Sequence, residues 1–456
     1  EGALNAISAL PIVKKIIPVA VYKKKKLELT SSPLLSRKYT LEFLDYGFAQ
    51  DQIEQINCHT AHEANYFGQG VRVLYIDTGY DLGHEAFDSL QLVAQYDFIN
   101  NDENTANENE QEIADNQDSH GTLCLSVLAG FKPGSLIGPA FKSEFLLAKT
   151  EIVTDEIQQE EDNFVAGLEW GEANGADVAC SSLGYLDWYS YCDMDGNTGV
   201  TTNAMDIAVS LGVVCVTSAG NWATPEPPPN PCDTLYYYIS APADADSVIA
   251  VGAVNSNGDI ANFSSHGPTY DGRIKPEVCA RGVSTWCVNS NSDSYQTASG
   301  TSLSAPLVGG AAAVVLSAHP DWTPMQVRDA FMMTADRADK PDNDYGYGVV
   351  DVMAAIEYDT SNVNDDMLPE EFSIIKVYPN PFNPSTTIWF RVETMHATSL
   401  QIYDITGQLV ETLVDNIVNP GEYKIEWHAN NMTSGIYFVQ LIADDQQLAK
   451  KITLIK

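Results

Sequence analysis

Short apolar runs alternate with longer amphipathic stretches between residues 71 and 317. The runs have the length of strands and are rich in Val, Ile, Leu and Ala, which is typical of strands buried on both faces of a parallel sheet. They are residues 71–76, 144–149, 177–181, 213–217 and 248–252. Helical periodicity occupies residues 120–129, 162–173, 202–210 and 301–318. The alternation predicts an α/β fold with a parallel β-sheet sandwiched by helices, in which functional groups gather at the carboxyl ends of the strands.

Beyond residue 371 the pattern of apolar residues changes to one with a period of two residues, which is typical of β-strands. Apolar and polar side chains alternate in 388–392 and 423–428, and turn signals such as Thr406-Gly407 and Pro420-Gly421 separate the runs. Further runs of the same kind are residues 399–403, 435–441 and 450–455. About six or seven short strands at this density predict a small all-β immunoglobulin-like sandwich. The acidic stretch 358–371, which has no periodicity, marks the boundary between the two parts.

The net charge narrows the range of partners. The chain has 456 residues, with 62 acidic and 24 basic side chains and a formal charge of −38. So acidic a body repels nucleic acid and anionic membranes, and we expect neither as a partner. No run of 18 apolar residues occurs, so we also expect no membrane-spanning helix.

Three short motifs carry candidate chemistry. The first predicted strand delivers Asp77 in Asp-Thr-Gly, His120 opens a helix in Ser-His-Gly-Thr, and Ser302 starts another helix in Gly-Thr-Ser-Leu-Ser-Ala-Pro. The amino terminus of a helix favours developing negative charge, which suits a nucleophilic serine. Asn221 follows a fourth strand and could donate its amide to an oxyanion.

Other hydrolase classes fit the sequence poorly. An aspartic protease needs two Asp-Thr-Gly loops, and this chain has one. A zinc protease of the His-Glu-x-x-His type is excluded, because no such motif occurs. A lipase would need Gly-x-Ser-x-Gly, which differs from the surroundings of Ser302.

Together these motifs resemble the subtilisin-like serine proteases, the subtilases, in the chain order aspartate, histidine, serine. The resemblance covers residues 66–357. It implies that Ser302 is the nucleophile, His120 the general base and then acid, Asp77 the residue that orients His120, and Asn221 the oxyanion donor. It also implies two peptide-binding segments, which flank the side chain before the cut. These are Ser182, Leu183 and Gly184 on one side, and Ser218, Ala219 and Gly220 on the other.

The same resemblance implies that the reaction needs no cofactor. Structural calcium is frequent in the family, and the acidic loop Asn100–Asp118 could supply ligands, although a solvated acidic loop would have the same composition. For an exported protein we predict disulfides between cysteines that flank loop sequence. These are Cys192 with Cys232 and Cys279 with Cys287, while Cys124, Cys180 and Cys215 stay free inside apolar runs.

Both ends of the chain add expectations about export. Val377-Tyr-Pro-Asn-Pro-Phe382, Tyr403-Asp-Ile-Thr-Gly407 and the last six residues resemble the sorting domain of the bacterial type IX secretion system. A carbohydrate-binding or merely stabilising sandwich is the alternative. Leu10–Val19 resembles the end of a subtilase propeptide, which would block the cleft; an ordinary basic arm would look the same.

The expected organisation therefore has four parts: a propeptide remnant and N-terminal arm (1–40), a subtilisin-like peptidase domain (41–357), an acidic linker (358–371) and a β-sandwich sorting domain (372–456). We predict a secreted or cell-surface endopeptidase that cuts proteins or peptides through an acyl-enzyme. Its partners would be these substrates, its own propeptide and the type IX machinery. The alternative is a catalytically silent subtilase that acts as a surface binding module.

Overall fold

The computed structural model divides the chain into two compact units, residues 1–360 and 361–456. The described residues are 44–154, 156–224, 232, 237–290, 292–359, 372–378, 382–392, 396–404, 408–418, 421–429, 432–443 and 446–454. The predicted propeptide remnant lies outside them.

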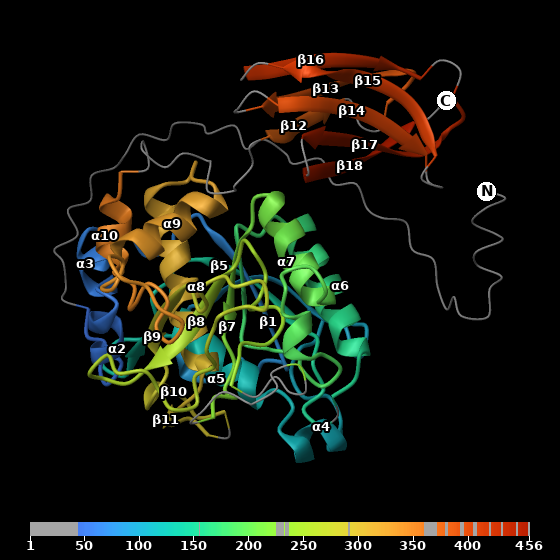
Figure 1. Cartoon of the computed structure of the whole chain (residues 1–456). Coiled ribbons are helices and arrows are strands. Elements are labelled where there is room, and N and C mark those ends of the chain that lie inside the picture. Colours follow the sequence, from blue (N-terminus) through green and yellow to red (C-terminus); the bar gives the residue numbers. More distant parts are fainter. Residues whose placement is uncertain are drawn as a thin grey trace, which may run out of the picture. The chain divides into compact units, whose positions relative to one another are not determined.

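A seven-stranded sheet forms the centre of the first unit, and all its neighbouring strands are parallel (Figure 1). In spatial order the strands are β2 (Gln91–Asp97), β5 (Glu144–Lys149), β1 (Arg72–Asp77), β6 (Val178–Ser181), β7 (Val214–Ser218), β8 (Ile249–Val254) and β9 (Val278–Arg281). The predicted α/β class with a parallel sheet is confirmed.

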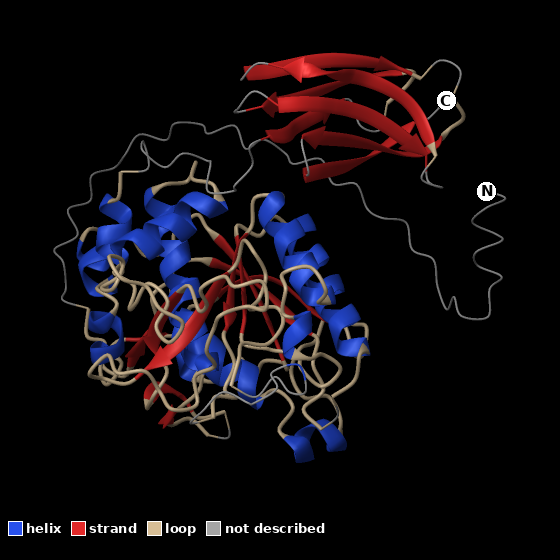
Figure 2. Cartoon of the chain, in the orientation of Figure 1, coloured by secondary structure: helices blue, strands red, loops and turns tan. Residues whose placement is uncertain are grey.

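Helices cover both faces of this sheet (Figure 2). Successive residues of a strand point to opposite faces, so Val73 and Tyr75 pack in one core and Leu74 and Ile76 in the other. The first core contains α5 (Ser119–Ala129) and α8 (Thr301–Ala318), and the second contains α6 (Gln159–Ala173) and α7 (Val200–Ser210). The other elements of this unit are α2 (Gln50–Gln55), α3 (Cys58–Glu63), η1 (Glu85–Phe87), α4 (Glu110–Asp115), β3 (Phe131–Lys132), β4 (Leu136–Ile137), η2 (Tyr191–Asp193), β10 (Thr285–Val288), β11 (Tyr295–Ala298), α9 (Pro324–Thr334) and α10 (Val352–Glu357).

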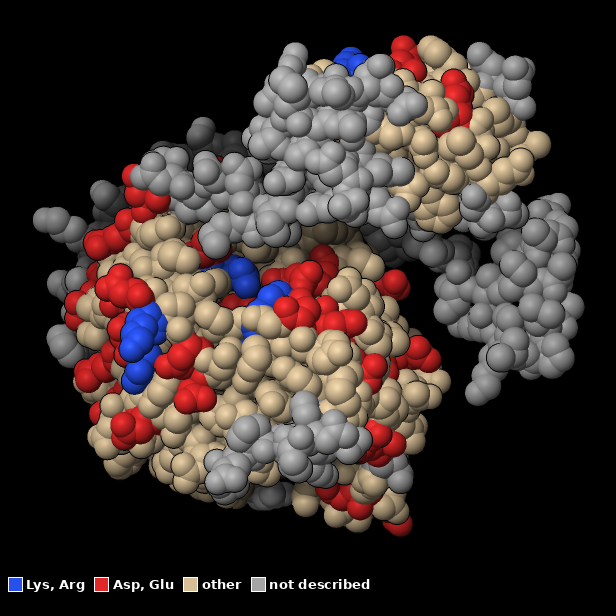
Figure 3. All heavy atoms as spheres, viewed as in Figure 1, with Lys and Arg blue, Asp and Glu red and all other residues tan. Residues whose placement is uncertain are grey.

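Helix α8 is the core helix of the first unit. Among the described residues it alone has the length and apolar composition that would cross a membrane, but 89% of it is buried inside the protein. It contacts β6, β7, β8, β9 and α5. The face shown in Figure 3 carries many acidic and few basic side chains. Helix α8 therefore belongs to the fold and places its amino terminus beside the ends of the central strands.

The cysteine predictions have mixed outcomes. Cys192 and Cys232 form a disulfide with a Cα–Cα distance of 5.2 Å, and Cys124, Cys180 and Cys215 are free and buried, as predicted. The predicted bridge between Cys279 and Cys287 is wrong, because both cysteines are free. Cys279 lies in β9 with its thiol directed at Tyr345 O, while Cys287 lies in β10 with its thiol directed at Gln296 O. The two cysteines are close in the sequence, but each is buried in a different strand and its thiol contacts a different carbonyl oxygen.

The second unit consists of two antiparallel sheets around a separate core. One sheet has the order β12 (Phe372–Tyr378), β13 (Ser385–Val392), β16 (Gly421–His428). The other has the order β15 (Leu409–Val418), β14 (His396–Asp404), β17 (Gly435–Ala443), β18 (Gln446–Leu454). Ile388 and Trp427 from the first sheet and Ile402 and Val439 from the second share one core. This is the predicted small β-sandwich.

A buried histidine in α3 predicts acid sensitivity of the first unit. His62 contacts Tyr46 Oη through Nδ1 (2.7 Å) and Pro139 O through Nε2 (2.8 Å). Burial lowers the pKa of His62 to about 4, against about 6.5 in an unfolded chain. Because the folded state binds this proton less well, the contribution of neutral His62 is complete above pH 6.5 and is lost as the pH falls towards 4. The loss amounts to about 3 kcal/mol.

We therefore expect urea unfolding of a His62→Phe variant to depend less on pH between 6.5 and 4 than that of the parent protein. The variant is less stable at neutral pH, since Tyr46 and Pro139 lose their partner. His428, whose side chain is 57% exposed, offers the control His428→Gln. Equal pH dependence in the parent and His62→Phe would contradict the assignment.

Candidate active site

The carboxyl ends of the central strands and the amino termini of α5 and α8 bring the predicted site residues to one edge of the sheet. Asp77 is the last residue of β1, and Asn221 is the third residue after the end of β7. His120 and Ser302 are each the second residue of their helix. Because β1, β6 and β7 are adjacent and parallel, their ends meet at this edge.

Asp77 and His120 are in direct contact. Asp77 Oδ1 lies 2.7 Å from His120 Nδ1 and also accepts a hydrogen bond from Thr78 N at 2.8 Å. The Asp77 side chain is fully buried, whereas 36% of the His120 side chain is exposed. Gly121 permits this approach, since a Cβ there would collide with the carbonyl oxygen of Gly79 and lie 3.1 Å from Asp77 Cβ.

The environment of His120 favours its charged form. Burial is the largest single effect and lowers the pKa of the imidazole. The charge and the hydrogen bond of Asp77, together with smaller contributions from Cys124, raise it, so the pKa of His120 stands well above its usual value. Cys124, one turn further along α5, places its sulfur 3.8 Å from Nε2 and 4.0 Å from Nδ1. Burial raises the pKa of the Cys124 thiol, so this neighbour is an uncharged one. Asp77 is therefore the group that supports an imidazolium here.

Ser302 is nearly buried and lies against the end of β6. Its hydroxyl donates to Ser182 O at 3.3 Å, and Ser182 Oγ donates in turn to Ser302 O at 2.9 Å. Within the described part of the chain, no hydrogen bond joins Ser302 Oγ to His120. Hydrogen bonds of this kind are often long or misaligned before a substrate binds. A rotation of the Ser302 side chain would redirect its hydroxyl.

The orientation of Asn221 is set by Thr301, which sequence analysis did not single out. Asn221 Oδ1 accepts from Thr301 N at 2.8 Å and from Thr301 Oγ1 at 3.0 Å. With its oxygen engaged, the amide presents Nδ2 on the other side, 3.6 Å from where a Cβ on Gly300 would lie. Thr301 adjoins Ser302, so the residue before the candidate nucleophile orients the candidate oxyanion donor. The only sign of this role of Thr301 in the sequence was its position inside the same motif as Ser302.

The two predicted peptide-binding segments lie side by side. Ser218 Oγ donates to Leu183 O at 3.4 Å, which links the two segments directly. Gly184 and Gly220 both lie close to Ser240: a Cβ on Gly184 would lie 2.5 Å from Ser240 Oγ, and one on Gly220 would lie 3.4 Å from it. Ala219 is fully buried, and Ser182 nearly so. One residue from each predicted segment thus approaches Ser240, which sequence analysis did not identify.

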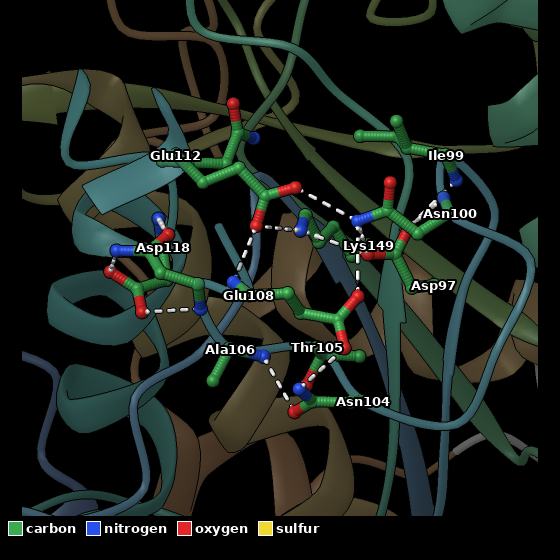
Figure 4. A network of polar contacts seen from close by, with 12 residues as sticks. Asp97, Ile99, Asn100, Asn104, Thr105, Ala106, Glu108, Glu112, Asp118 and Lys149 are labelled. Atoms are coloured by element: carbon green, nitrogen blue, oxygen red, sulfur yellow. Dashed lines mark hydrogen bonds and ion pairs between the residues drawn. The ribbon is translucent and has the colours of Figure 1, made fainter. Parts of the chain in front are cut away.

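The carboxylate cluster at the start of the acidic loop does not fit a calcium ion in this arrangement. Asp97, Asp102 and Glu108 bring carboxylate oxygens within 4.8 Å of one another. However, Asp97 Oδ1 already accepts from the backbone of residues 99 and 100, and Oδ2 already contacts Asn100 and Lys149 (Figure 4). A carboxylate offers about four lone-pair positions, so Asp97 is saturated. The loop predicted to be an irregular surface segment also contains the short helix α4, capped by Asn109.

Comparisons with known proteins identify the family of each unit. Residues 68–348 match the model described as the subtilase family, and residues 376–456 match a secretion system C-terminal sorting domain. Subtilisin E of Bacillus subtilis is 33% identical over 308 residues, which are 67% of this chain and 70% of that protein. Subtilisin of Bacillus pumilus is also 33% identical, with 98% of its length covered.

Solved structures show the same fold. MycP1 from the ESX-1 type VII secretion system is 25% identical and has a TM-score of 0.54, over 70% of this chain and 87% of that one. MycP3 protease from the type VII (ESX-3) system is 21% identical, with a TM-score of 0.55 over 70% and 90% of the two chains.

Proposed function

The chain belongs to the subtilase family of serine endopeptidases, and we propose that Asp77, His120 and Ser302 form its catalytic triad, with Asn221 as an oxyanion donor. The observation that carries the proposal is the 2.7 Å contact between buried Asp77 and His120 Nδ1, next to the amino terminus of the helix that begins with Thr301-Ser302. An imidazole held in this way by a carboxylate keeps its other nitrogen available as a base.

The proposed reaction is peptide-bond hydrolysis in two steps. His120 Nε2 accepts the hydroxyl proton of Ser302 as Oγ attacks the scissile carbonyl carbon. The oxyanion that forms is held by Asn221 Nδ2 and by backbone N–H groups at the start of α8. His120 then gives its proton to the leaving amine, and an acyl-enzyme remains at Ser302. Water deprotonated by His120 releases the acyl group and restores the serine. No cofactor takes part.

The charge state of His120 sets the pH range. Only the neutral imidazole can accept the Ser302 proton, and Asp77 raises the pKa of His120. The proposed activity is therefore lost as the pH falls through that raised pKa and is retained in alkaline solution. The same negative charge stabilises the imidazolium that forms in the transition state.

An extended peptide is proposed to pair with the backbone of residues 182–184 and 218–220. These segments follow β6 and end β7 respectively, so a bound strand would lie across the edge of the sheet above Ser302.

The C-terminal unit directs the protease outside the cell. Its sorting domain marks the chain for secretion and surface attachment by the type IX system. We propose that residues 41–357 are the peptidase domain, 358–371 the linker and 372–456 the sorting domain. We further propose that residues 1–40 are a propeptide remnant and arm that bind the acidic peptidase domain.

Labelling with a fluorophosphonate tests the proposed function, because the reagent modifies a serine only where a neighbouring base activates it. Peptide mapping of the labelled protein is expected to find the adduct on Ser302. The catalytically silent alternative requires no labelling and no hydrolysis of casein or a peptide library. Label on another serine would contradict the assigned triad.

The oxyanion role predicts a moderate loss on substitution of Asn221. Asn221→Leu keeps the size of the side chain but removes Nδ2, and kcat is expected to fall about 10²- to 10³-fold with KM little changed. Steady-state kinetics on a peptide substrate measure both quantities. Asn197, which is exposed and donates to Asp195 O, provides the matched control Asn197→Leu. A larger rise in KM than fall in kcat would assign Asn221 to substrate binding instead.

A further inference from the structure

Lys149 is a buried cation directly beside the site. It is the last residue of β5, and in the sheet its Cα pairs with that of Asp77 in β1. Its side chain is fully buried, and Nζ lies 2.8 Å from Asp97 Oδ2 and 3.1 Å from Glu112 Oε2 (Figure 4). A lysine without contact to water is tolerated only when its charge is compensated in this way.

The two carboxylates come from opposite parts of one loop. Asp97 ends β2, and Glu112 lies in α4. The amide of Asn100 joins them, since it donates to Asp97 Oδ2 at 3.1 Å and to Glu112 Oε1 at 2.8 Å. It also donates to Glu108 Oε2 at 3.2 Å. Lys149 is the cation in this group of carboxylates, so it closes the loop of residues 98–118 into one packed unit (Figure 4).

This loop is fastened to the end of β1 next to Asp77. Tyr80 N donates to Thr105 O at 2.9 Å, and Gln117 Nε2 donates to Thr78 O at 2.7 Å. The aliphatic part of the Lys149 side chain packs against the turn after β1, because a Cβ on Gly79 would lie 3.2 Å from Lys149 Cδ.

The loop leads directly into the helix that carries the proposed base. Asp118 is held by Asn107, whose Nδ2 donates to Asp118 Oδ1 at 2.8 Å. Residue 119 then begins α5, and His120 is its second residue. The position of His120 against Asp77 therefore depends on where the loop ends.

We infer that Lys149 is a positioning residue for His120: its buried ammonium binds Asp97, directly before the 98–118 loop, and Glu112 in α4, and so holds the start of α5 against Asp77. The inference rests on the proposed function of His120. In this role the lysine takes the structural place that a bound metal ion would have in an acidic loop. Without it, Asp97 and Glu112 would face each other and Glu108 with no cation between them, and their repulsion would open the loop.

The test compares two buried lysines. Lys149→Met keeps the length of the side chain and removes the charge. Lys275→Met is the matched control, because Lys275 is also buried and paired, with Nζ 2.8 Å from Glu277 Oε1. Both variants are expected to unfold at lower temperature than the parent. Only Lys149→Met is expected to lose kcat, by about 30- to 100-fold with KM within about threefold, since a shift of about 1 Å in a reacting group costs about 10²-fold.

The full-length protein is assayed at a temperature where circular dichroism shows each variant folded. Unchanged kcat in folded Lys149→Met, or an equal loss in Lys275→Met, overturns the inference. If Lys149→Met does not fold, Asp97→Asn replaces it, because the asparagine oxygen can still accept from the backbone of residues 99 and 100 while the ion pair is lost. Its kcat is expected to fall about tenfold at unchanged KM, and a parental kcat would again overturn the inference.

Failure of the proposed function would look different. In that case the parent protein itself would neither hydrolyse peptides nor react with fluorophosphonate at Ser302. A parent that is labelled and active, together with a fully active Lys149→Met variant, would refute the positioning role alone.

Discussion

Ser302→Ala is expected to lower kcat by about six orders of magnitude, and His120→Ala by about as much. The alanine at 302 removes the nucleophile, and the alanine at 120 leaves the Ser302 hydroxyl without a base to take its proton. The double variant should lose no more than either single variant, because the groups act as one unit. The size of the effect is that found for the same constellation in subtilisin. KM should change little, since neither side chain forms the walls of the peptide-binding segments.

A serine on the same helix provides the control for this experiment. Ser304 is fully buried in α8, and its hydroxyl donates to Thr301 O at 2.9 Å. Ser304→Ala therefore perturbs the helix without touching His120, and its kcat should stay within a few-fold of the parent. Peptidase activity above about 1% in Ser302→Ala, with no contaminating protease in a mock purification, would refute the assignment of the nucleophile.

The central strands could be predicted because burial on both faces leaves a nearly continuous apolar run. Strands β1, β5, β6, β7 and β8 all have this form, and each was predicted to within about two residues, the usual uncertainty of such boundaries. Strand β2 was not predicted, because it is the edge strand and its first residues, Gln91, Leu92 and Val93, are exposed. Strand β9 was missed too, since four residues ending in Arg281 do not form a recognisable run.

The candidate site could be predicted because each motif stands at the end of a strand or the start of a helix. In a parallel sheet these places meet at one edge, so local patterns carry three-dimensional information. Contacts made by residues to which no motif assigns a role could not be predicted. Thr301 orients Asn221 through two hydrogen bonds, and Ser240 lies close to both Gly184 and Gly220, which are far apart in the sequence.

Lys149 did leave a signal in the sequence. It ends a strand whose residues 145–148 are all apolar, and an acidic loop lies earlier in the chain. A charged residue inside a buried strand requires a partner of opposite charge, and the loop is one source of such a partner. The pattern predicts an ion pair but not its partners, because the loop has seven acidic residues. The structure selects Glu112 from the loop and Asp97, which directly precedes it.

Asp77→Asn is expected to reduce kcat by roughly four orders of magnitude, between the effects at Ser302 and at Asn221. Asp77 Oδ1 contacts both Thr78 N and His120 Nδ1. If the asparagine oxygen takes this place, its NH₂ group occupies the buried position of Oδ2 and the negative charge beside the imidazole is gone. If the amide is reversed, its NH₂ group faces Thr78 N and forces His120 Nδ1 to accept, so that Nε2 carries the proton and cannot act as a base.

Either arrangement impairs the base while leaving Ser302 and the peptide-binding segments in place, so KM should stay near the parental value. Asp81, in the turn after β1, offers the control Asp81→Asn, since its carboxylate accepts only from Gly83 N at 2.8 Å among the contacts described and does not touch His120. Loss of the Asp77 charge should also lower the pKa of His120, because that charge is the largest of the effects that raise it. The residual activity of Asp77→Asn should therefore begin at lower pH than that of the parent. An unchanged acid limit would show that Asp77 does not set the charge state of His120, and its place in the triad would have to be given up.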